Sequence, residues 1–385
     1  MRSWLLPEYV EDLLPPEAEQ IECLRRQMLD TLRGAGYRLI VPPLLEYVDS
    51  LLTDTGDEMA LKTCQLVDQL SGRSMGIRAD ITPQAARIDA HLLNAAGVTR
   101  LCYAASVVHA RPSGLMGNRE PLQLGAELFG HAGVESDIEI LQLLLQTLSI
   151  AVPDRFTLDI GHVGVFHALV EAGQLSDALA NDLFAALQSK DQSALQQLTQ
   201  AIAEPSIAQA LQRLPELYGE SNSVLQQARA QLPNLAKISV ALDNLAAIVA
   251  GLTAYSRKIS LDLGELRGYH YHTGVVFSAY ARGCPNAIAR GGRYDAIGKI
   301  FGRARPATGF SLDLRELVKL APAQSEPNAW YAPYAPDDPA LQQFVKRLRA
   351  QGEIVITALP QAPAPSERFL QQSATGEWQL PSTAA

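Results

Sequence analysis

Two polar side chains interrupt an otherwise apolar segment at residues 122–129. The segment reads Leu-Gln-Leu-Gly-Ala-Glu-Leu-Phe, with an amide at Gln123 and a carboxylate at Glu127. Residues i, i+2 and i+4 of a strand share one face, so both side chains would point the same way. A carboxylate on an apolar strand is costly to bury alone. The pair is therefore expected to face a cationic group, such as the ammonium of a ligand.

A second polar pair stands at the end of residues 75–81, which are expected to form a strand. Asp80 and Thr82 flank the strand end, and Thr82-Pro83 is a typical start of a helix. From this position both side chains can point into a cleft. Asp80 could instead simply cap the helix.

Residues 266–277 read Leu-Arg-Gly-Tyr-His-Tyr-His-Thr-Gly-Val-Val-Phe. One guanidinium, two tyrosines and two histidines are unusual for a core strand, and they suit recognition of a small, polar, planar ligand. His270 and His272 could ligate a metal, but a third ligand is not evident, so we expect no metal site. Gly291-Gly292 could hold a phosphate, although a close approach of two strands is the simpler interpretation.

These segments need an α+β scaffold to position them. The spacing of apolar residues predicts helices at 17–32 and 138–148. Strands are expected at 37–41, 75–81, 100–108 and 122–129. Strand signals return at residues 259–320, where the pattern predicts a closing helix from Ser311.

The middle and the end of the chain differ in composition from these strand-rich parts. Residues 163–255 are rich in Ala, Leu and Gln with helical periodicity, which predicts a helical insertion in one large domain, residues 1–320. The last 65 residues hold nine of the 23 prolines, yet they contain a candidate helix at 340–350 and a strand at 353–359. We expect a small C-terminal α/β unit at 321–385.

Composition excludes several classes of function. The 385 residues carry a net charge of −9, which disfavours a protein that coats nucleic acid, since phosphates need clustered Lys and Arg. No apolar run reaches the roughly 20 residues of a membrane span. The four cysteines form no CxxC pair, which argues against a disulfide framework and favours the reducing cytoplasm. They are Cys23, Cys64, Cys102 and Cys284.

Taken together and in this order, the segments resemble histidyl-tRNA synthetase and its paralogues. Residues 36–46 resemble the first, dimer-forming motif of class II aminoacyl-tRNA synthetases. Residues 103–130 resemble the second motif and residues 291–320 the third. The segment that begins at Arg267 resembles the signature of the histidine enzyme. The resemblance covers about residues 5–320 and implies a class II antiparallel sheet flanked by helices.

Two positions depart from synthetases that activate an amino acid with ATP. Where the second motif has an arginine for the α-phosphate, an ungapped match places His109, with Arg111 and Arg119 nearby. Where the third motif has Gly-Leu-Glu-Arg, residues 313–316 read Asp-Leu-Arg-Glu. Arg315 is one residue off, which turns it about 100° on a helix. A carboxylate facing triphosphate replaces attraction with repulsion, so the resemblance implies lost adenylation chemistry.

The resemblance implies that the amino-acid pocket is kept. Seven positions match residues that hold free histidine in the family: Asp80, Thr82, Gln123, Glu127, Arg267, Tyr271 and His272. The first four would hold the α-ammonium, Arg267 would pair with the carboxylate, and Tyr271 would lie against the imidazole. His272 stands where synthetases commonly have a second tyrosine. The 65 residues after Leu320 are fewer than an anticodon-binding domain needs, so tRNA is not an expected partner.

One paralogous family fits these departures, the regulatory subunit of ATP phosphoribosyltransferase. Membership implies a non-catalytic cytoplasmic protein of histidine biosynthesis without a cofactor. It would bind L-histidine for feedback, activate the short-form catalytic subunit, and form a homodimer within a hetero-oligomer. Two alternatives stay open. One is an active or repurposed synthetase in which Arg111, Arg119 or Arg315 reaches ATP, and the other is a degenerate fold with an empty pocket, kept for assembly.

Overall fold

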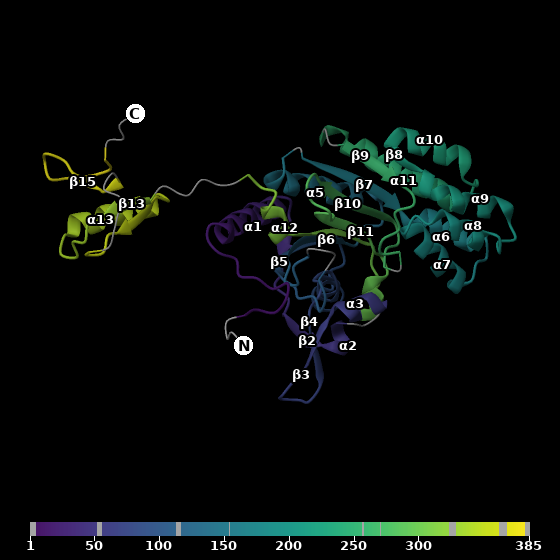
Figure 1. Ribbon diagram of the computed structural model, residues 1–385, viewed down its shortest axis with the longest axis horizontal. Coiled ribbons are helices and arrows are strands. Elements are labelled where there is room, and N and C mark those ends of the chain that lie inside the picture. Colours follow the sequence, from purple (N-terminus) through teal and green to yellow (C-terminus); the bar gives the residue numbers. More distant parts are fainter. Residues whose placement is uncertain are drawn as a thin grey trace. The chain divides into compact units, whose positions relative to one another are not determined.

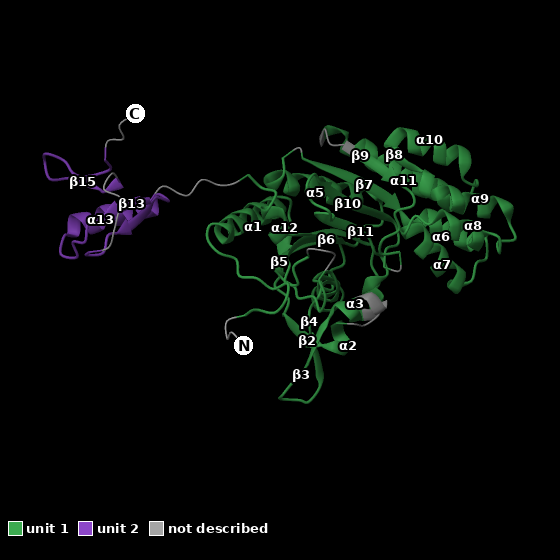
Figure 2. Cartoon of the chain, in the orientation of Figure 1, with its two compact units in different colours: residues 1–322 green, residues 323–385 purple. Residues whose placement is uncertain are grey.

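The chain forms two compact units, residues 1–322 and 323–385 (Figure 2). The computed structural model describes residues 5–51, 56–112, 117–153, 155–255, 258–269, 271–322, 329–361 and 368–381. Each unit has its own cluster of buried apolar side chains. Within the described ranges, helices are too short or too polar to cross a lipid bilayer.

A mixed β-sheet forms the centre of the first unit (Figure 1). Among the described residues, nine strands lie in the order β1-β5-β6-β12-β11-β10-β7-β9-β8. They are β1 Arg38–Leu39, β5 Thr99–Ser106, β6 Leu122–Phe129, β7 Phe156–His162, β8 Tyr218–Glu220, β9 Lys258–Asp262, β10 Val275–Ala281, β11 Ala289–Arg293 and β12 Ala307–Asp313. From β5 to β7 all neighbours are antiparallel, whereas β1 joins β5 and β9 joins β7 in parallel. The predicted α+β class with a largely antiparallel sheet is confirmed.

Three long helices bury their apolar stripes against this sheet: α1 Glu17–Gly34, α5 Val134–Ala151 and α11 Ala236–Leu252. Helix α5 starts four residues before the predicted 138–148, because Glu135 and Asp137 in its first turn favour a helix N-terminus. Its Leu144 and Leu148 have no exposed surface and pack in the main core. The helices thus seal one face of the sheet.

A smaller sheet, in the order β2-β4-β3, leads into the segment around Arg78, which contacts the central sheet. Its strands are β2 Leu45–Tyr47, β3 Cys64–Val67 and β4 Ser74–Ile77, and the nearby helices are α2 Val48–Leu51, α3 Gly56–Lys62 and α4 Thr82–Arg87. The buried Arg78 guanidinium donates to the carbonyls of Pro42 at 2.7 Å and Ser106 at 2.9 Å. These bonds fix the end of β4, and α4 then begins with Pro83 in its first turn.

Residues 163–255 form mainly helices, as their periodicity predicts, with one strand that the sequence did not reveal. The further helices of this segment are α6 Val163–Ala172, α7 Asp177–Gln188, α8 Gln192–Thr199, α9 Pro205–Arg213 and α10 Ser221–Gln231. Between α9 and α10, strand β8 pairs with β9 and extends the central sheet. Three residues with a glycine in the middle, Gly219, give too weak a period-2 pattern to predict.

The helix expected from Ser311 begins only at Leu314 (α12, Leu314–Val318), because Ser311 lies inside β12 opposite Gly125. The strand signals expected within 259–320 correspond to β9, β10, β11 and β12, whereas the described residues between β9 and Val275 form turns and bends. Gly268 has φ +71, a left-handed conformation that a strand does not contain.

The second unit is a small βαβ structure with a hairpin. Its elements are β13 Ala329–Ala332, α13 Pro339–Ala350, β14 Ile354–Thr357, β15 Gln371–Gln372 and β16 Trp378–Gln379. Asp338 caps α13 by accepting a bond from the Leu341 N–H at 3.0 Å. Leu341 and Val345 pack with Val355 of β14, which runs parallel to β13. The helix and strand expected in this region are confirmed.

Candidate functional site

The sheet face opposite the long helices is lined with small residues where β6, β12, β11 and β10 lie side by side. Directly opposed residues point to the same side of a sheet, so Glu127, Gly309 and Gly292 form one row. A Cβ atom at Gly309 would overlap the Glu127 carboxylate, and one at Gly292 would lie 2.6 Å from the His272 ring. Gly291 and Gly292 therefore mark a close strand approach, and the glycines leave space above the sheet.

Glu127 is the deepest charged group of this face, with 1% of its surface exposed. Its Oε1 accepts hydrogen bonds from Thr82 at 3.0 Å and from Tyr103 at 2.9 Å, and Tyr294 donates to Oε2. Burial raises the pKa of the Glu127 carboxyl to about 8, although the three hydroxyls oppose this shift. Such a carboxyl is a strong acceptor for a cationic N–H that enters the site.

Asp80, Thr82 and Gln123 meet beside this carboxylate. The Gln123 amide donates to Asp80 Oδ1 at 2.7 Å, and its oxygen accepts from the Ile81 N–H at 3.0 Å. Asp80 Oδ1 also accepts from the Thr82 N–H at 3.1 Å, so Asp80 braces the start of α4 as well as facing the cavity. Asp80 thus contacts the first turn of α4 and also lines the cavity, and its role in binding a ligand stays a prediction.

The turn at residues 267–272 brings the aromatic part of the site. Gly268 O accepts bonds from the backbone N–H groups of Tyr271 and His272, at 2.8 and 2.7 Å. Tyr271 stacks on Tyr294, with ring centroids 5.2 Å apart, and its buried hydroxyl has no hydrogen-bond partner among the residues that the structure describes. A buried hydroxyl without a partner is costly, so this group is expected to bond to a ligand.

The same turn is anchored in the helical insertion. Tyr269 stacks between His167 of α6, at 4.5 Å, and Phe184 of α7, at 5.3 Å. Arg267 is more open, with 52% of its side chain exposed, and its nearest partners are Tyr280 at 3.4 Å and Glu265 at 3.7 Å. The turn is thus held at Tyr269 and Tyr271, while the guanidinium stays accessible.

A cavity of about 630 Å³ lies above these residues. Six of the seven predicted residues line it: Asp80, Thr82, Glu127, Arg267, Tyr271 and His272. The seventh, Gln123, is hydrogen-bonded to Asp80 and lines a neighbouring cavity instead. We call the 630 Å³ space the first cavity. It combines carboxylates, a guanidinium and aromatic rings within a volume that suits an amino acid.

The neighbouring space, the second cavity, has about 590 Å³ and contains most positions at which the sequence departs from the synthetase motifs. His109 and Arg111 line it together with Asp313 and Glu316. Burial, and then nearby Lys62, lower the pKa of His109 despite its bond to Ala79 O. Burial also raises the pKa of Asp313 to about 6.

Three arginines, Arg111, Arg119 and Arg315, could take the place of the arginines that the synthetase motifs carry. Two of them contact other parts of the chain. Arg119 Nε donates to His109 O at 2.9 Å, and Arg315 contacts Glu120 at 3.5 Å and Glu11 O at 3.2 Å. Neither lines the second cavity, whereas Arg111 does.

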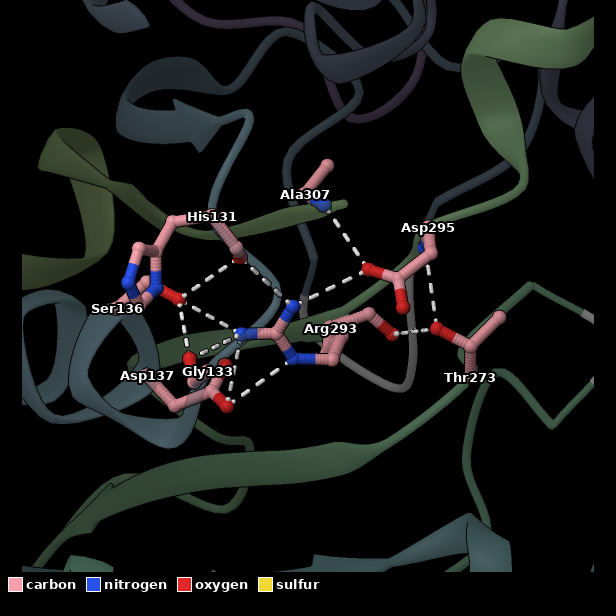
Figure 3. Close-up of polar contacts among 8 residues, drawn as sticks. All are labelled: His131, Gly133, Ser136, Asp137, Thr273, Arg293, Asp295 and Ala307. Carbon is pink, nitrogen blue, oxygen red and sulfur yellow. Dashed lines mark hydrogen bonds and ion pairs between the residues drawn. The ribbon is translucent and has the colours of Figure 1, made fainter. Parts of the chain in front are cut away.

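Sequence reasoning missed Tyr103 and Tyr294, the two phenols on Glu127. Tyr294 follows Arg293, whose buried guanidinium holds several segments together (Figure 3). Arg293 Nη2 donates to Asp137 at 3.0 Å, and Arg293 Nη1 donates to Asp295 at 3.3 Å. Arg293 and Asp295 do pair, as one interpretation expected, but Asp137 is the nearer carboxylate. The polar run Arg-Tyr-Asp after two glycines was the available signal.

Metal binding has no support among the described side chains, where His, Cys, Asp and Glu form no group of three suited to an ion. His270, one member of the His-x-His pair, lies outside the described residues. His272 Nδ1 lies 3.2 Å from Gly268 O, which accounts for one of its ring nitrogens.

The geometry can be compared with known proteins. A family model described as Histidyl-tRNA synthetase matches residues 9–317, and one described as ATP phosphoribosyltransferase subunit HisZ C-terminal domain matches residues 327–381. A crystal structure titled as an ATP phosphoribosyltransferase regulatory subunit/histidyl-tRNA synthetase from Bacillus halodurans is 26% identical, with a TM-score of 0.82. That match covers 94% of this chain and 95% of the other.

Two relatives named ATP phosphoribosyltransferase regulatory subunit are each 55% identical to this chain. In the Nitrosospira multiformis protein the match covers 94% of this chain and 92% of the relative. In the Ralstonia nicotianae protein it covers 96% and 94%. The chain therefore belongs to the family of ATP phosphoribosyltransferase regulatory subunits, which is built on the class II fold of histidyl-tRNA synthetase.

Proposed function

We propose that this chain binds L-histidine in the first cavity and acts as a non-catalytic regulatory subunit of ATP phosphoribosyltransferase. One observation carries the proposal: the first cavity holds the Asp80 and Glu127 carboxylates, the Arg267 guanidinium and the Tyr271 ring in one small space. These groups complement an ammonium, a carboxylate and a planar heterocycle. Charge-assisted bonds of this kind are each worth about 1.5–3 kcal/mol when well placed.

Each part of histidine has a partner in this arrangement. Asp80, Thr82, Gln123 and Glu127 accept or orient the α-ammonium, with Glu127 the deepest acceptor. Arg267 pairs with the carboxylate, and its exposed side chain can turn toward the ligand. Tyr271 and His272 flank the imidazole, and the Tyr271 hydroxyl supplies a bond that the ligand-free protein leaves unmade.

Regulation then follows from coupling between this pocket and the catalytic subunit. The names of the relatives support assembly with ATP phosphoribosyltransferase, and we take the partner to be its short form, with both acting in the cytoplasm. Histidine inhibits only if it binds one state of the complex more tightly than another, and such coupling is typically about 1–3 kcal/mol. ATP and phosphoribosyl pyrophosphate bind the partner, so this chain needs no cofactor and no tRNA.

The deciding experiment pairs calorimetry with an assay of ATP–pyrophosphate exchange. We expect L-histidine to bind with measurable heat and the exchange rate to equal the blank, because His109 and Glu316 stand where the synthetase motifs carry arginines. Glu127→Gln should lose histidine binding, while Glu19→Gln, on an exposed turn of α1, should retain it. Absence of heat with histidine together with measurable exchange would overturn the proposal.

The second candidate, an active synthetase, rests on Arg111. It lines the second cavity, where an arginine could meet a phosphate. The exchange assay on Arg111→Gln discriminates between the two functions. A rate above the blank that disappears in this variant supports the synthetase, and no exchange in either protein supports the regulatory subunit.

We also propose that the chain assembles as a homodimer within the complex. Apolar side chains of the segment that resembles the dimer-forming motif are exposed: Leu39 at 56%, Val41 at 83%, Leu44 at 44% and Leu45 at 43%. Clustered exposed apolar residues commonly mark interfaces. An isologous, two-fold contact would cover the same segment on both copies.

A further inference from the structure

Arg293, the last residue of β11, has a buried guanidinium at a point where several segments of the first unit meet (Figure 3). Apart from Asp295, its acceptors lie at residues 131–137, where β6 leads into α5. They are His131 O at 3.2 Å, Gly133 O at 3.1 Å, Ser136 Oγ at 2.7 Å and Asp137 Oδ2 at 3.0 Å. A guanidinium has five N–H donors in one plane, so it holds acceptors that a lysine ammonium, with three donors on one atom, cannot reach together.

The main chain at Arg293 holds the end of the turn at residues 267–272. Arg293 O accepts a hydrogen bond from the Thr273 N–H at 2.8 Å, and Thr273 Oγ1 accepts one from the Asp295 N–H at 3.0 Å. The turn is therefore anchored at this end as well as at Tyr269, which stacks in the helical insertion. The aromatic rings that face the first cavity lie between the two anchors.

Asp295 extends the same network to β12. Its Oδ1 accepts hydrogen bonds from Arg293 Nη1 and, at 2.9 Å, from the N–H of Ala307, the first residue of β12. Between the two, the Tyr294 N–H donates to Ala307 O at 2.8 Å. The backbone on both sides of Tyr294 is thus fixed, and its hydroxyl reaches Glu127.

The part of the first cavity around Asp80 is held by other residues. The Gln123 amide donates to Asp80, and the buried Arg78 fixes the preceding strand end through backbone carbonyls. A change at Arg293 should therefore displace the aromatic side of the cavity and leave the Asp80 side in place.

We propose that Arg293 is a positioning residue of the first cavity, which sets the place of the Tyr271 ring relative to the Glu127 carboxylate. A buried ion pair such as that of Arg293 with Asp137 is weak evidence for stability, because desolvation of two charges offsets much of their attraction. What the network provides is geometry, since the turn, β11, β12 and the end of β6 are all bonded to one planar group. The role rests on the proposed binding of histidine and includes no contact between Arg293 and the ligand.

Arg293→Lys tests this role, because it keeps the charge and loses the planar set of donors. In calorimetry on the full chain, we expect histidine affinity to fall about tenfold or more, since the hydrogen bond from Tyr271 is misplaced. Arg305→Lys is the matched control. Arg305 is also 7% exposed and pairs with a buried carboxylate, Asp89, at 2.8 Å, but it lines neither cavity. Both variants should melt at lower temperature than the parent, and only Arg293→Lys should change histidine affinity by more than about twofold.

A spectroscopic measurement without ligand reports the position of the ring itself. In the full chain labelled with 3-fluorotyrosine, the ¹⁹F signal of Tyr271 is identified by its absence in Tyr271→Phe. We expect this signal to shift in Arg293→Lys and to stay in place in Arg305→Lys, because only Arg293 is bonded to the segment that follows the turn. General destabilisation would not separate the two variants.

Thr273→Val tests the same role with a smaller change, because it removes the acceptor of the Asp295 N–H and keeps the shape of the side chain. The Tyr271 signal should shift, and histidine affinity should fall about threefold. This variant decides the question where Arg293→Lys fails to fold.

The outcomes separate the positioning role from the proposed function. An unmoved Tyr271 signal in the Arg293 and Thr273 variants overturns the role, as do equal losses of histidine affinity in Arg293→Lys and Arg305→Lys. Both results leave the histidine pocket standing. A parent chain that binds no histidine overturns the proposed function, and a Tyr271 signal that shifts only with changes at Arg293 or Thr273 still supports the placement of the ring by Arg293.

Discussion

Glu127 combines full burial with hydrogen bonds from three hydroxyls, those of Thr82, Tyr103 and Tyr294. A hydroxyl stabilises a carboxylate less than a cationic partner would, so the effect of burial prevails and the pKa of Glu127 is about 8. Near neutral pH, and without a ligand, the Glu127 carboxyl is thus largely protonated. A cationic ligand favours the ionised form, so binding at pH 7 releases a proton and strengthens as the pH rises.

The free energy of unfolding without ligand should respond to pH in the opposite direction from ligand affinity. The unfolded carboxyl has its ordinary pKa of 4.5, so between 4.5 and about 8 the folded chain holds a proton that the unfolded chain has released. The free energy of unfolding should fall with rising pH across this window, by up to about 1.4 kcal/mol per pH unit from this group. Denaturant unfolding of the parent and of Glu127→Gln from pH 5 to pH 9 measures the difference, which also cancels the contribution of Asp313. Parallel pH profiles would contradict the assignment.

The hydroxyl of Tyr271 gives a second prediction at this scale. Tyr271→Phe should leave the free energy of unfolding unchanged or raise it by up to about 1 kcal/mol, because a buried hydroxyl without a partner is removed. Histidine affinity should fall about tenfold, since the bond to the ligand is lost.

Tyr294→Phe is the matched control for Tyr271→Phe, because its hydroxyl donates to Glu127. It should lower the free energy of unfolding in the absence of ligand. Chemical denaturation and calorimetry on both variants provide the comparison. A stability loss in Tyr271→Phe equal to that in Tyr294→Phe would show that the Tyr271 hydroxyl already has a partner.

At the scale of elements, the row of glycines in β11 and β12 sets the depth of the cleft. Gly309→Ala would place a methyl group on the Glu127 carboxylate and 2.7 Å from Ala126 O. We expect a loss of about 1–3 kcal/mol in the free energy of unfolding and a loss of histidine binding, because the carboxylate must move. Thermal melts and calorimetry test both effects.

Gly34→Ala is the control for this substitution. No atom lies within 4 Å of the added Cβ, and Gly34 ends helix α1. Alanine is the better helix former, so stability should stay the same or rise. An undiminished histidine affinity in Gly309→Ala would show that the glycine row does not shape the pocket.

The elements also show how far a sequence can be interpreted. The β6 strand matches its predicted limits, because its mostly apolar run is bounded by Pro121 and Gly130. Strand β8 and the turn around Gly268 were not predictable in the same way. The first is stabilised by β9, 38 or more residues away, and the second by a positive φ and by Tyr269 stacked in the insertion.

The candidate site also contains residues that the sequence could predict and residues that it could not. Polar residues that interrupt apolar segments, such as Asp80 and Glu127, identified themselves by the cost of burying them alone. Tyr103 did not, because a tyrosine in an apolar segment is also an ordinary core residue. Tyr294 stands in a polar run, Arg-Tyr-Asp, which did not show that its hydroxyl would reach Glu127.

At the scale of the whole molecule, the exposed apolar segment from Leu39 to Leu45 should decide the oligomeric state. Val41→Asp puts a charge on a side chain that is 83% exposed and, in the proposed dimer, covered. We expect a dimer of the parent chain and a monomer of the variant in sedimentation equilibrium. Val240→Asp, at a 58% exposed position of α11, is the control and should remain dimeric. A parent chain that sediments as a monomer would contradict the proposed homodimer.

Residues 313–316 stabilise the start of helix α12 and its surroundings. Asp313 accepts bonds from the Leu122 and Arg315 N–H groups at 3.1 and 3.0 Å and starts α12. Arg315 contacts Glu120, and Glu316 pairs with Lys319 at 2.9 Å. Replacing residues 313–316 by Gly-Leu-Glu-Arg would therefore remove a helix cap and two ion pairs. A variant built to bind a phosphate at this place would start from a less stable fold, so a negative exchange assay on it needs a stability measurement beside it.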